Sequence, residues 1–219
     1  MNQQLVLTSF KICPYVQRAV IALNEKGVPY TIQYINPYED NPAWFKAISP
    51  FGKVPVLQVN GQPVFESAII LEYLEEVYVP HFHPADPLTK ATQRAWMEFS
   101  SDLLVRQYHM NNAPDAEAFE KAKASFAEGL QRLGEQLHVT GPYFSGTELC
   151  LVDIACAPMF MRLALMEERF KFNVDKSERV QQWSAALLAR PSVHNSVVPE
   201  FKELFMEFLQ KRGSFFMRA

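Results

Sequence analysis

The stretch SFKICPYVQR, residues 9–18, decides the fold of this 219-residue chain because it places one thiol where a strand gives way to a helix. The apolar run at residues 5–7 predicts the strand, and apolar residues recur at helical spacing over residues 16–23. Pro14 suits the first helical position, since its fixed φ fits a helix and its missing N–H would have had no intrahelical partner. Cys13 is therefore predicted to be the N-cap residue of this helix.

This position favours a reactive thiol at Cys13. The free N–H groups and the positive end of the helix dipole both favour the thiolate, and the first turn carries no acid. Lys11 and Arg18 would act in the same direction if they lie close in space. A buried cysteine that only fills space is the alternative, but a Cys-Pro pair between strand and helix is typical of reactive thiols. Residue 16 is Val16, where a Cys-x-x-Cys motif would have its second sulfur, so a disulfide at Cys13 needs an external thiol to resolve it.

The composition predicts a globular protein of one large or two small domains, with 48% hydrophobic and 21% charged residues. A net charge of −3 excludes a basic footprint for nucleic acid or for an anionic membrane surface. The chain shows no basic leader with an apolar segment and no apolar run near the roughly 18 residues of a membrane span, so we expect a cytoplasmic protein. Three cysteines argue against a disulfide framework, and Cys150 and Cys156 are interpreted as packing residues.

Strand and helix signals alternate through the first third of the chain. Gly27 and Pro29 end the first helix, and Asn60-Gly61 between two apolar runs predicts a hairpin. Further elements are expected over residues 30–35 (strand), 42–48 (one or two helical turns) and from residue 67 (helix). The order β-α-β-α-β-β-α predicts a small α/β sheet domain with helices on its faces.

The remainder of the chain has helical periodicity and no convincing strand. We predict an α/β domain at residues 1–79, a proline-rich linker at 80–88 and an all-α domain at 89–219. Helices are expected over residues 88–110, 116–137, 151–166 and 180–188, and through 201–208. His81 and His83 in the linker have no cysteine or acid at zinc spacing, so they predict solvated histidines and no metal site.

Two further segments could complete a site around the thiol. Val54 precedes Pro55 and is therefore extended, and at the start of an edge strand its backbone could pair with a peptide-like ligand. Only about 5–6% of X-Pro bonds are cis, so the sequence by itself favours a trans Pro55. Ser67 is a suitable N-cap with no acid at position 70 to close a capping box, which leaves the helix N-terminus free for an external anion, and Glu66 could pair with an amine. Singly, each segment also fits an ordinary turn or helix start; jointly, the two segments and the thiol describe a ligand like glutathione.

With these motifs the chain resembles the cytosolic glutathione transferases, which join a thioredoxin-like domain to an all-helical one. The resemblance covers essentially the whole chain and rests on CPYV with Arg18, on KVPVL at residues 53–57 and on ESAII at residues 66–70. It is nearest the cysteine-type members, the omega, lambda and dehydroascorbate-reductase groups. It implies that Cys13 is the nucleophile, and that glutathione, as co-substrate, is bound by Tyr15, Lys53, Val54, a cis Pro55, Glu66 and Ser67.

The resemblance implies further properties. A hydrophobic second-substrate site is expected between the domains, touching Tyr15, Tyr108, Phe215 and Phe216. The protein is expected to be a two-fold homodimer without a metal, which transfers thiols or reduces mixed disulfides and small oxidised acceptors with glutathione, in redox or detoxification chemistry.

Two alternatives remain open. Ser9 could activate the thiol of glutathione itself for conjugation to electrophiles, although the cysteine at the N-cap favours a structural Ser9. The chain could also be a non-catalytic interaction protein of this fold, which would not need a complete ligand site. One departure from the family pattern is Cys150, which stands where Ser or Thr often precedes Asp153 and predicts a cap weaker by up to about 1 kcal/mol. Pro158 is expected to bend the same helix.

Overall fold

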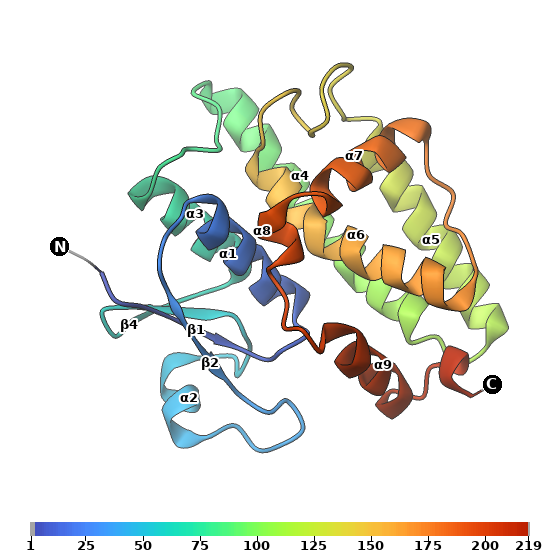
Figure 1. Ribbon diagram of the computed structural model, residues 1–219, viewed down its shortest axis with the longest axis horizontal. Coiled ribbons are helices and arrows are strands. Elements are labelled where there is room, and N and C mark those ends of the chain that lie inside the picture. Colours follow the sequence, from blue (N-terminus) through green and yellow to red (C-terminus); the bar gives the residue numbers. More distant parts are fainter. Residues whose placement is uncertain (1–2, 219) are drawn as a thin grey trace.

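The computed structural model describes residues 3–218, and its first part is a four-stranded sheet with helices on both faces (Figure 1). The strands are β1 (Leu5–Ser9), β2 (Thr31–Tyr34), β3 (Val56–Val59) and β4 (Gln62–Phe65), in the order β2-β1-β3-β4. β1 is parallel to β2 and antiparallel to β3, and β3 and β4 form the predicted hairpin. α1 (Pro14–Glu25) and α3 (Ser67–Val77) pack together on one face, and α2 (Ala43–Ile48) lies on the other. The predicted α/β class and element order are confirmed.

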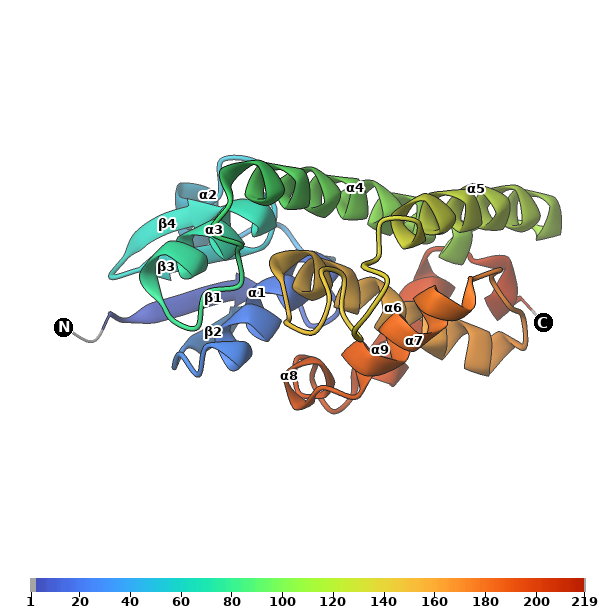
Figure 2. The same ribbon diagram turned by 90° about the horizontal axis from the view of Figure 1, so that it is seen from above.

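The second part is helical, as predicted. It consists of α4 (Pro87–Asn111), α5 (Ala116–Gly134), α6 (Leu151–Phe170), α7 (Glu178–Leu188), α8 (Pro191–His194), α9 (Phe201–Lys211) and the 3-10 helix η1 (Phe215–Met217). α4 extends from the sheet part along one side of the molecule to α5 (Figure 2). α6 is the central helix and packs against α1, α4 and α7. The sequence did not predict α8 or η1; Pro191, expected to end a helix, begins α8.

Local signals account for most element boundaries. Cys13 is the N-cap of α1 with Pro14 in the first turn, as predicted. Gly27 follows the helix with φ of +60°, and the hairpin turn has φ of +49° at Asn60 and +86° at Gly61. A left-handed φ costs glycine little and asparagine less than most residues, which explains both positions.

The start of α3 differs from the prediction by one residue. Ser67 was expected to be the N-cap, but the helix begins at Ser67 and Glu66 is the N-cap. The Glu66 carbonyl accepts the first helical hydrogen bond from Ile70 N at 2.9 Å, and Glu66 has φ of +70°. The residue type at position 67 predicted a cap there, but the backbone conformation at Glu66 decides where the helix begins.

Val54 does not begin an edge strand. β3 starts at Val56 and lies between β1 and β4, so the edge-strand prediction is wrong. The Val54–Pro55 peptide is cis, as the family resemblance implied. Within residues 3–218, neither backbone group of Val54 is hydrogen-bonded to another backbone group. Its backbone is therefore available for pairing, although for a different reason from the one expected.

Residues 78–86 connect α3 to α4, so the last two residues of the linker predicted at 80–88 belong to α4. His81 is exposed as expected, but the His83 side chain is only 3% exposed and its Nε2 lies 2.9 Å from Glu72 Oε1, so the prediction of a solvated His83 is wrong. Metal-binding clusters of acidic, His and Cys side chains are absent from the described residues. Over the same range, no helix is long and apolar enough to cross a membrane.

Asp153 organises the start of α6. Its Oδ2 accepts a hydrogen bond from the N–H of the N-cap residue Cys150 at 2.8 Å. Its Oδ1 accepts from Phe144 N at 2.9 Å and from Trp183 Nε1 at 2.6 Å. The carboxylate is fully buried and connects the loop before α6 with α7. Cys150 and Cys156 are buried, which confirms their interpretation as packing residues.

Candidate functional site

Cys13 lies at the junction of β1 and α1 with only 6% of its surface exposed. Cys13 lines two cavities. One, of about 300 Å³, lies between the start of α1, α4 and α9. The other, of about 190 Å³, lies beside β1, β2 and residues 195–198. Small reactants could therefore reach this residue from two sides.

The thiol of Cys13 is not activated overall in this structure. Burial raises its pKa, and this effect outweighs the N–H groups of Val16 and Tyr15, which lower it as the helix N-terminus was expected to do. Arg162 and Arg18 also lower it. The predicted net preference for thiolate is therefore wrong, because burial of the sulfur raises its pKa by more than the helix N-terminus lowers it. Lys11 does not contribute, since its Nζ lies 2.7 Å from Glu200 Oε1.

The direction of this shift predicts the pH dependence of Cys13 alkylation by iodoacetamide. Below its pKa a thiol gains about tenfold in thiolate fraction per pH unit, so the rate should keep rising past the pKa of about 8.5 of an ordinary cysteine. The rate on the Cys13 peptide can be followed by mass spectrometry between pH 6 and pH 10. A rate that levels off near pH 7 would contradict the effect of burial.

Arg162 was missed by the sequence reasoning. It lies on α6, 150 residues from Ile12 in the chain, yet its Nη2 donates to the Ile12 carbonyl at 2.7 Å. Its Nη1 donates to Pro158 O at 2.8 Å and to Gln17 Oε1 at 2.6 Å. Arg162 lines both cavities next to Cys13. The only signal in the sequence was an arginine within the apolar stretch of residues 154–166, and it does not identify what the side chain contacts.

Arg18 connects α1 with both parts of the molecule. Its Nε donates to Ala155 O at 2.9 Å on α6, and its two terminal nitrogens donate to Ser100 Oγ and Ser101 Oγ on α4, each at 2.9 Å. A longer bond of 3.4 Å reaches Ser67 Oγ at the start of α3. Arg18, two residues after the CPYV motif, therefore connects the start of α3 to the helical part.

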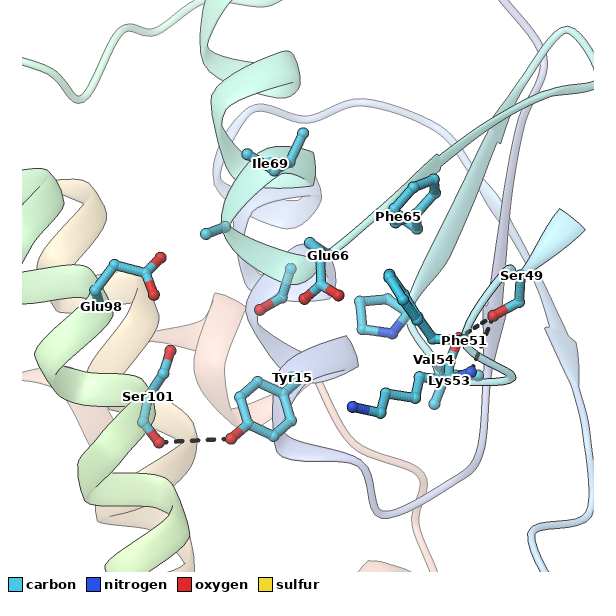
Figure 3. Close-up of a pocket in the computed structure, with 13 residues that line it drawn as sticks. Tyr15, Ser49, Phe51, Lys53, Val54, Phe65, Glu66, Ile69, Glu98 and Ser101 are labelled. Atoms are coloured by element: carbon cyan, nitrogen blue, oxygen red, sulfur yellow. Dashed lines mark hydrogen bonds between the residues drawn. The ribbon is translucent and has the colours of Figure 1, made fainter.

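The residues predicted to bind glutathione line one cavity of about 600 Å³ (Figure 3). All six are there: Tyr15, Lys53, Val54, Pro55, Glu66 and Ser67. Figure 3 shows the Lys53 and Glu66 side chains and the Tyr15 ring around the same space. Cys13 does not line this cavity, but Tyr15 lines both this cavity and the 300 Å³ cavity, so it joins the two.

Further residues of this cavity were not predicted. Ser49 holds the loop before Val54, because its Oγ accepts from Lys53 N at 2.9 Å and donates to Lys53 O at 2.8 Å. Glu98 and Ser101 come from α4, and the exposed Phe51 and Phe65 form an aromatic pair at 6.0 Å. Their contribution depends on how α4 and the loop pack, which no local pattern specifies.

The 300 Å³ cavity corresponds only in part to the expected second-substrate site. Tyr15 and Tyr108 line it together with Cys13, and so do Phe205 and Phe208 of α9. Phe215 and Phe216 do not, so their assignment is wrong. They belong to η1 and pack on Phe119 of α5, because Phe215 N donates to Ala113 O and directs η1 towards α5.

Ser9 is buried at the end of β1. Its Oγ donates to the Phe10 carbonyl at 3.0 Å, and the residue lines the 190 Å³ cavity and not the 600 Å³ one. A hydroxyl with this bond is poorly placed to reach a thiol bound in the larger cavity.

Comparisons with known proteins identify relatives in sequence and in fold. A family model described as "Glutathione S-transferase, N-terminal domain" matches residues 12–77. The omega-1 glutathione S-transferase of Sus scrofa is 33% identical over 84% of this chain and 77% of its own length. The crystal structure of glutathione transferase Omega 3C from Trametes versicolor has a TM-score of 0.81 and 31% identity, over 96% of this chain and 92% of its own. A rice glutathione transferase solved in complex with glutathione has a TM-score of 0.82 and 25% identity, over 96% of both chains.

Proposed function

The chain belongs to the glutathione S-transferase family, a family of transferases, and we propose that it is a cysteine-type member that transfers thiols or reduces mixed disulfides through Cys13. One observation carries this proposal: Cys13 is the N-cap of α1 and borders a cavity that shares Tyr15 with the cavity of the glutathione-binding candidates. The omega-class relatives support the cysteine type.

The 600 Å³ cavity has groups that match glutathione from end to end. The Glu66 carboxylate can pair with the ligand amine, and the N-terminus of α3, which has no acid in its first turn, can accept the carboxylate beside it. The free backbone of Val54 can pair with the cysteinyl part, and Lys53 can hold the glycyl carboxylate. The rice relative, which was solved with glutathione, supports this site.

The reaction proceeds by two thiol–disulfide exchanges. The Cys13 thiolate attacks the glutathione sulfur of a mixed disulfide, the S–S bond breaks, and the acceptor thiolate leaves and takes up a proton. A second glutathione thiolate then attacks the glutathione sulfur of the enzyme mixed disulfide, releases oxidised glutathione and returns Cys13 as thiolate. Since Val16 replaces a resolving cysteine, the second step uses an external thiol.

A direct assay distinguishes this function from its alternatives. Purified protein is tested for glutathione-dependent reduction of a small glutathionylated disulfide and for conjugation of an aryl halide. We expect reduction. Conjugation without reduction would favour a mechanism in which the thiol of glutathione itself attacks the electrophile, with or without activation by Ser9. Neither activity, with no retention on immobilised glutathione, would favour an interaction protein.

Glu66→Gln tests the glutathione site. The variant removes a charge-assisted hydrogen bond to the ligand amine, worth about 1.5–3 kcal/mol, so the Kd for glutathione should rise about tenfold to a hundredfold. Isothermal titration calorimetry measures it. Glu76→Gln, on the exposed side of the same helix, is the matched control and should leave the Kd unchanged. Equal effects of the two substitutions would remove Glu66 from the site.

We also propose that the protein is a homodimer, as family resemblance implies. Phe51 is 66% exposed and, with Phe65 and Ile69, leaves apolar surface beside the glutathione cavity. Sedimentation velocity at micromolar concentration should give a species of twice the 25.1 kDa chain mass. A single species at the chain mass would contradict the dimer.

A further inference from the structure

Two buried arginines next to Cys13 have no acidic partner. Arg18 is 1% and Arg162 is 4% exposed. The acceptors bonded to Arg162 are all neutral: the carbonyls of Ile12 and Pro158 and the amide oxygen of Gln17. Among the ion pairs of residues 3–218 neither arginine appears. A buried charge without an opposite charge is costly, so these arginines call for an anion nearby.

The group that can supply this anion to Arg162 is the thiol of Cys13. Burial lowers the pKa of Arg162 to about 10, which keeps the guanidinium charged at neutral pH, and Cys13 acts in the opposite direction. Cys13 and Arg162 line the same two cavities. No aspartate or glutamate lines either cavity, so no carboxylate in them competes for the guanidinium.

The other charged or titratable groups around the thiol do not replace Arg162. On α1, Arg18 directs its hydrogen bonds to α3, α4 and α6, and Tyr15 is neutral, with burial raising its pKa. Across the larger cavity lie Tyr108 and the exposed Arg212. Across the smaller one lie Tyr30, Tyr34 and Lys11, and Lys11 is paired with Glu200. Arg162 alone combines a buried charge with a bond to the segment that carries the thiol.

We propose that Arg162 is the positioning residue of the reactive thiol. It holds the Ile12 carbonyl directly before Cys13, and it supplies the positive charge that balances the Cys13 thiolate, both as nucleophile and as leaving sulfur. The catalytic part of this statement rests on the proposed thiol chemistry. The electrostatic part concerns the thiol alone and can be measured without glutathione.

The test is the pH profile of Cys13 alkylation by iodoacetamide, followed on the Cys13 peptide by mass spectrometry. Arg162→Met should raise the titration midpoint by at least about one pH unit, a tenfold loss of thiolate at any pH below the midpoint. Arg162→Gln keeps a donor for the Ile12 carbonyl but removes the charge, so its midpoint should rise as it does in Arg162→Met. Arg132→Met removes an exposed arginine of α5 and is the control without a shift.

Two outcomes would overturn the proposal: an unchanged midpoint in folded Arg162→Met, or a rise in Arg162→Met that is absent in Arg162→Gln, which would assign the effect to the lost hydrogen bond and not to the charge. If Arg162→Met does not fold, Gln17→Glu decides. It keeps the arginine and offers it a carboxylate at the position of the amide oxygen now 2.6 Å away. The midpoint should again rise, and an unchanged midpoint rejects the proposal.

The two proposals can fail separately. If the protein lacks glutathione-dependent reduction but its Cys13 alkylation midpoint depends on Arg162, the proposed function is wrong and this inference stands. If the protein reduces mixed disulfides through Cys13 but its alkylation midpoint is independent of Arg162, the proposed function stands and this inference is wrong.

Discussion

Cys13→Ser is expected to lower kcat/KM for glutathione-dependent reduction of a small mixed disulfide by at least about a thousandfold. A serine hydroxyl does not form the enzyme mixed disulfide, because its oxygen is scarcely ionised and makes no stable bond to sulfur at neutral pH. The rate is measured by coupling the oxidised glutathione formed to its reduction. Mass spectrometry of the native protein should also show one glutathione bound to the peptide that contains Cys13.

Cys150→Ser is the matched control for this substitution. Cys150 is the N-cap of α6, away from both cavities that Cys13 lines, and serine is the better cap residue. This variant should retain the native rate. If Cys13→Ser also retains it, Cys13 is not the nucleophile. Conjugation that survives the loss of reduction would show that glutathione bound in its cavity reacts without the cysteine.

Asp153→Ala should produce the largest loss of stability. The substitution removes the acceptor of three buried N–H groups, those of Cys150, Phe144 and the Trp183 ring. Each unsatisfied buried donor costs about 1–3 kcal/mol, so we expect the free energy of unfolding to fall by roughly 3–5 kcal/mol. Urea denaturation followed by tryptophan fluorescence measures it.

Two variants frame this result. Asp175→Ala removes an exposed carboxylate between α6 and α7 and should change the free energy of unfolding by no more than about 0.5 kcal/mol. Asp153→Asn keeps one acceptor oxygen and should lie between the native protein and Asp153→Ala. A loss below about 1 kcal/mol for Asp153→Ala would show that water satisfies the three donors.

At the Cys150 cap, the structure shows more stabilising contacts than the sequence predicted. A weaker cap was expected because sulfur is a poor acceptor. In the structure the backbone N–H of Cys150 donates to the Asp153 carboxylate, so the side chain of Asp153 stabilises the start of α6. The bonds from Phe144 and Trp183 add tertiary connections to the local cap. The sequence prediction concerned the Cys150 sulfur alone and included none of these three bonds.

The sequence by itself determined the features that depend on a few neighbouring residues. Cys-Pro after a strand determined the N-cap of α1, Asn60-Gly61 determined the hairpin, and apolar spacing determined the long helices. The six residues predicted for the glutathione site lie together because they sit at the ends of these elements, and the element order brings those ends to one edge of the sheet.

Only the tertiary structure decided the state of the thiol. The sequence gives the helix N-terminus next to Cys13, which lowers its pKa, but not the packing of α4, α6 and α9, which removes water and raises it. It also does not show that Arg162 reaches Ile12 from α6. Burial and long-range charge pairs are sums over residues that only folding brings together, and no local pattern specifies them.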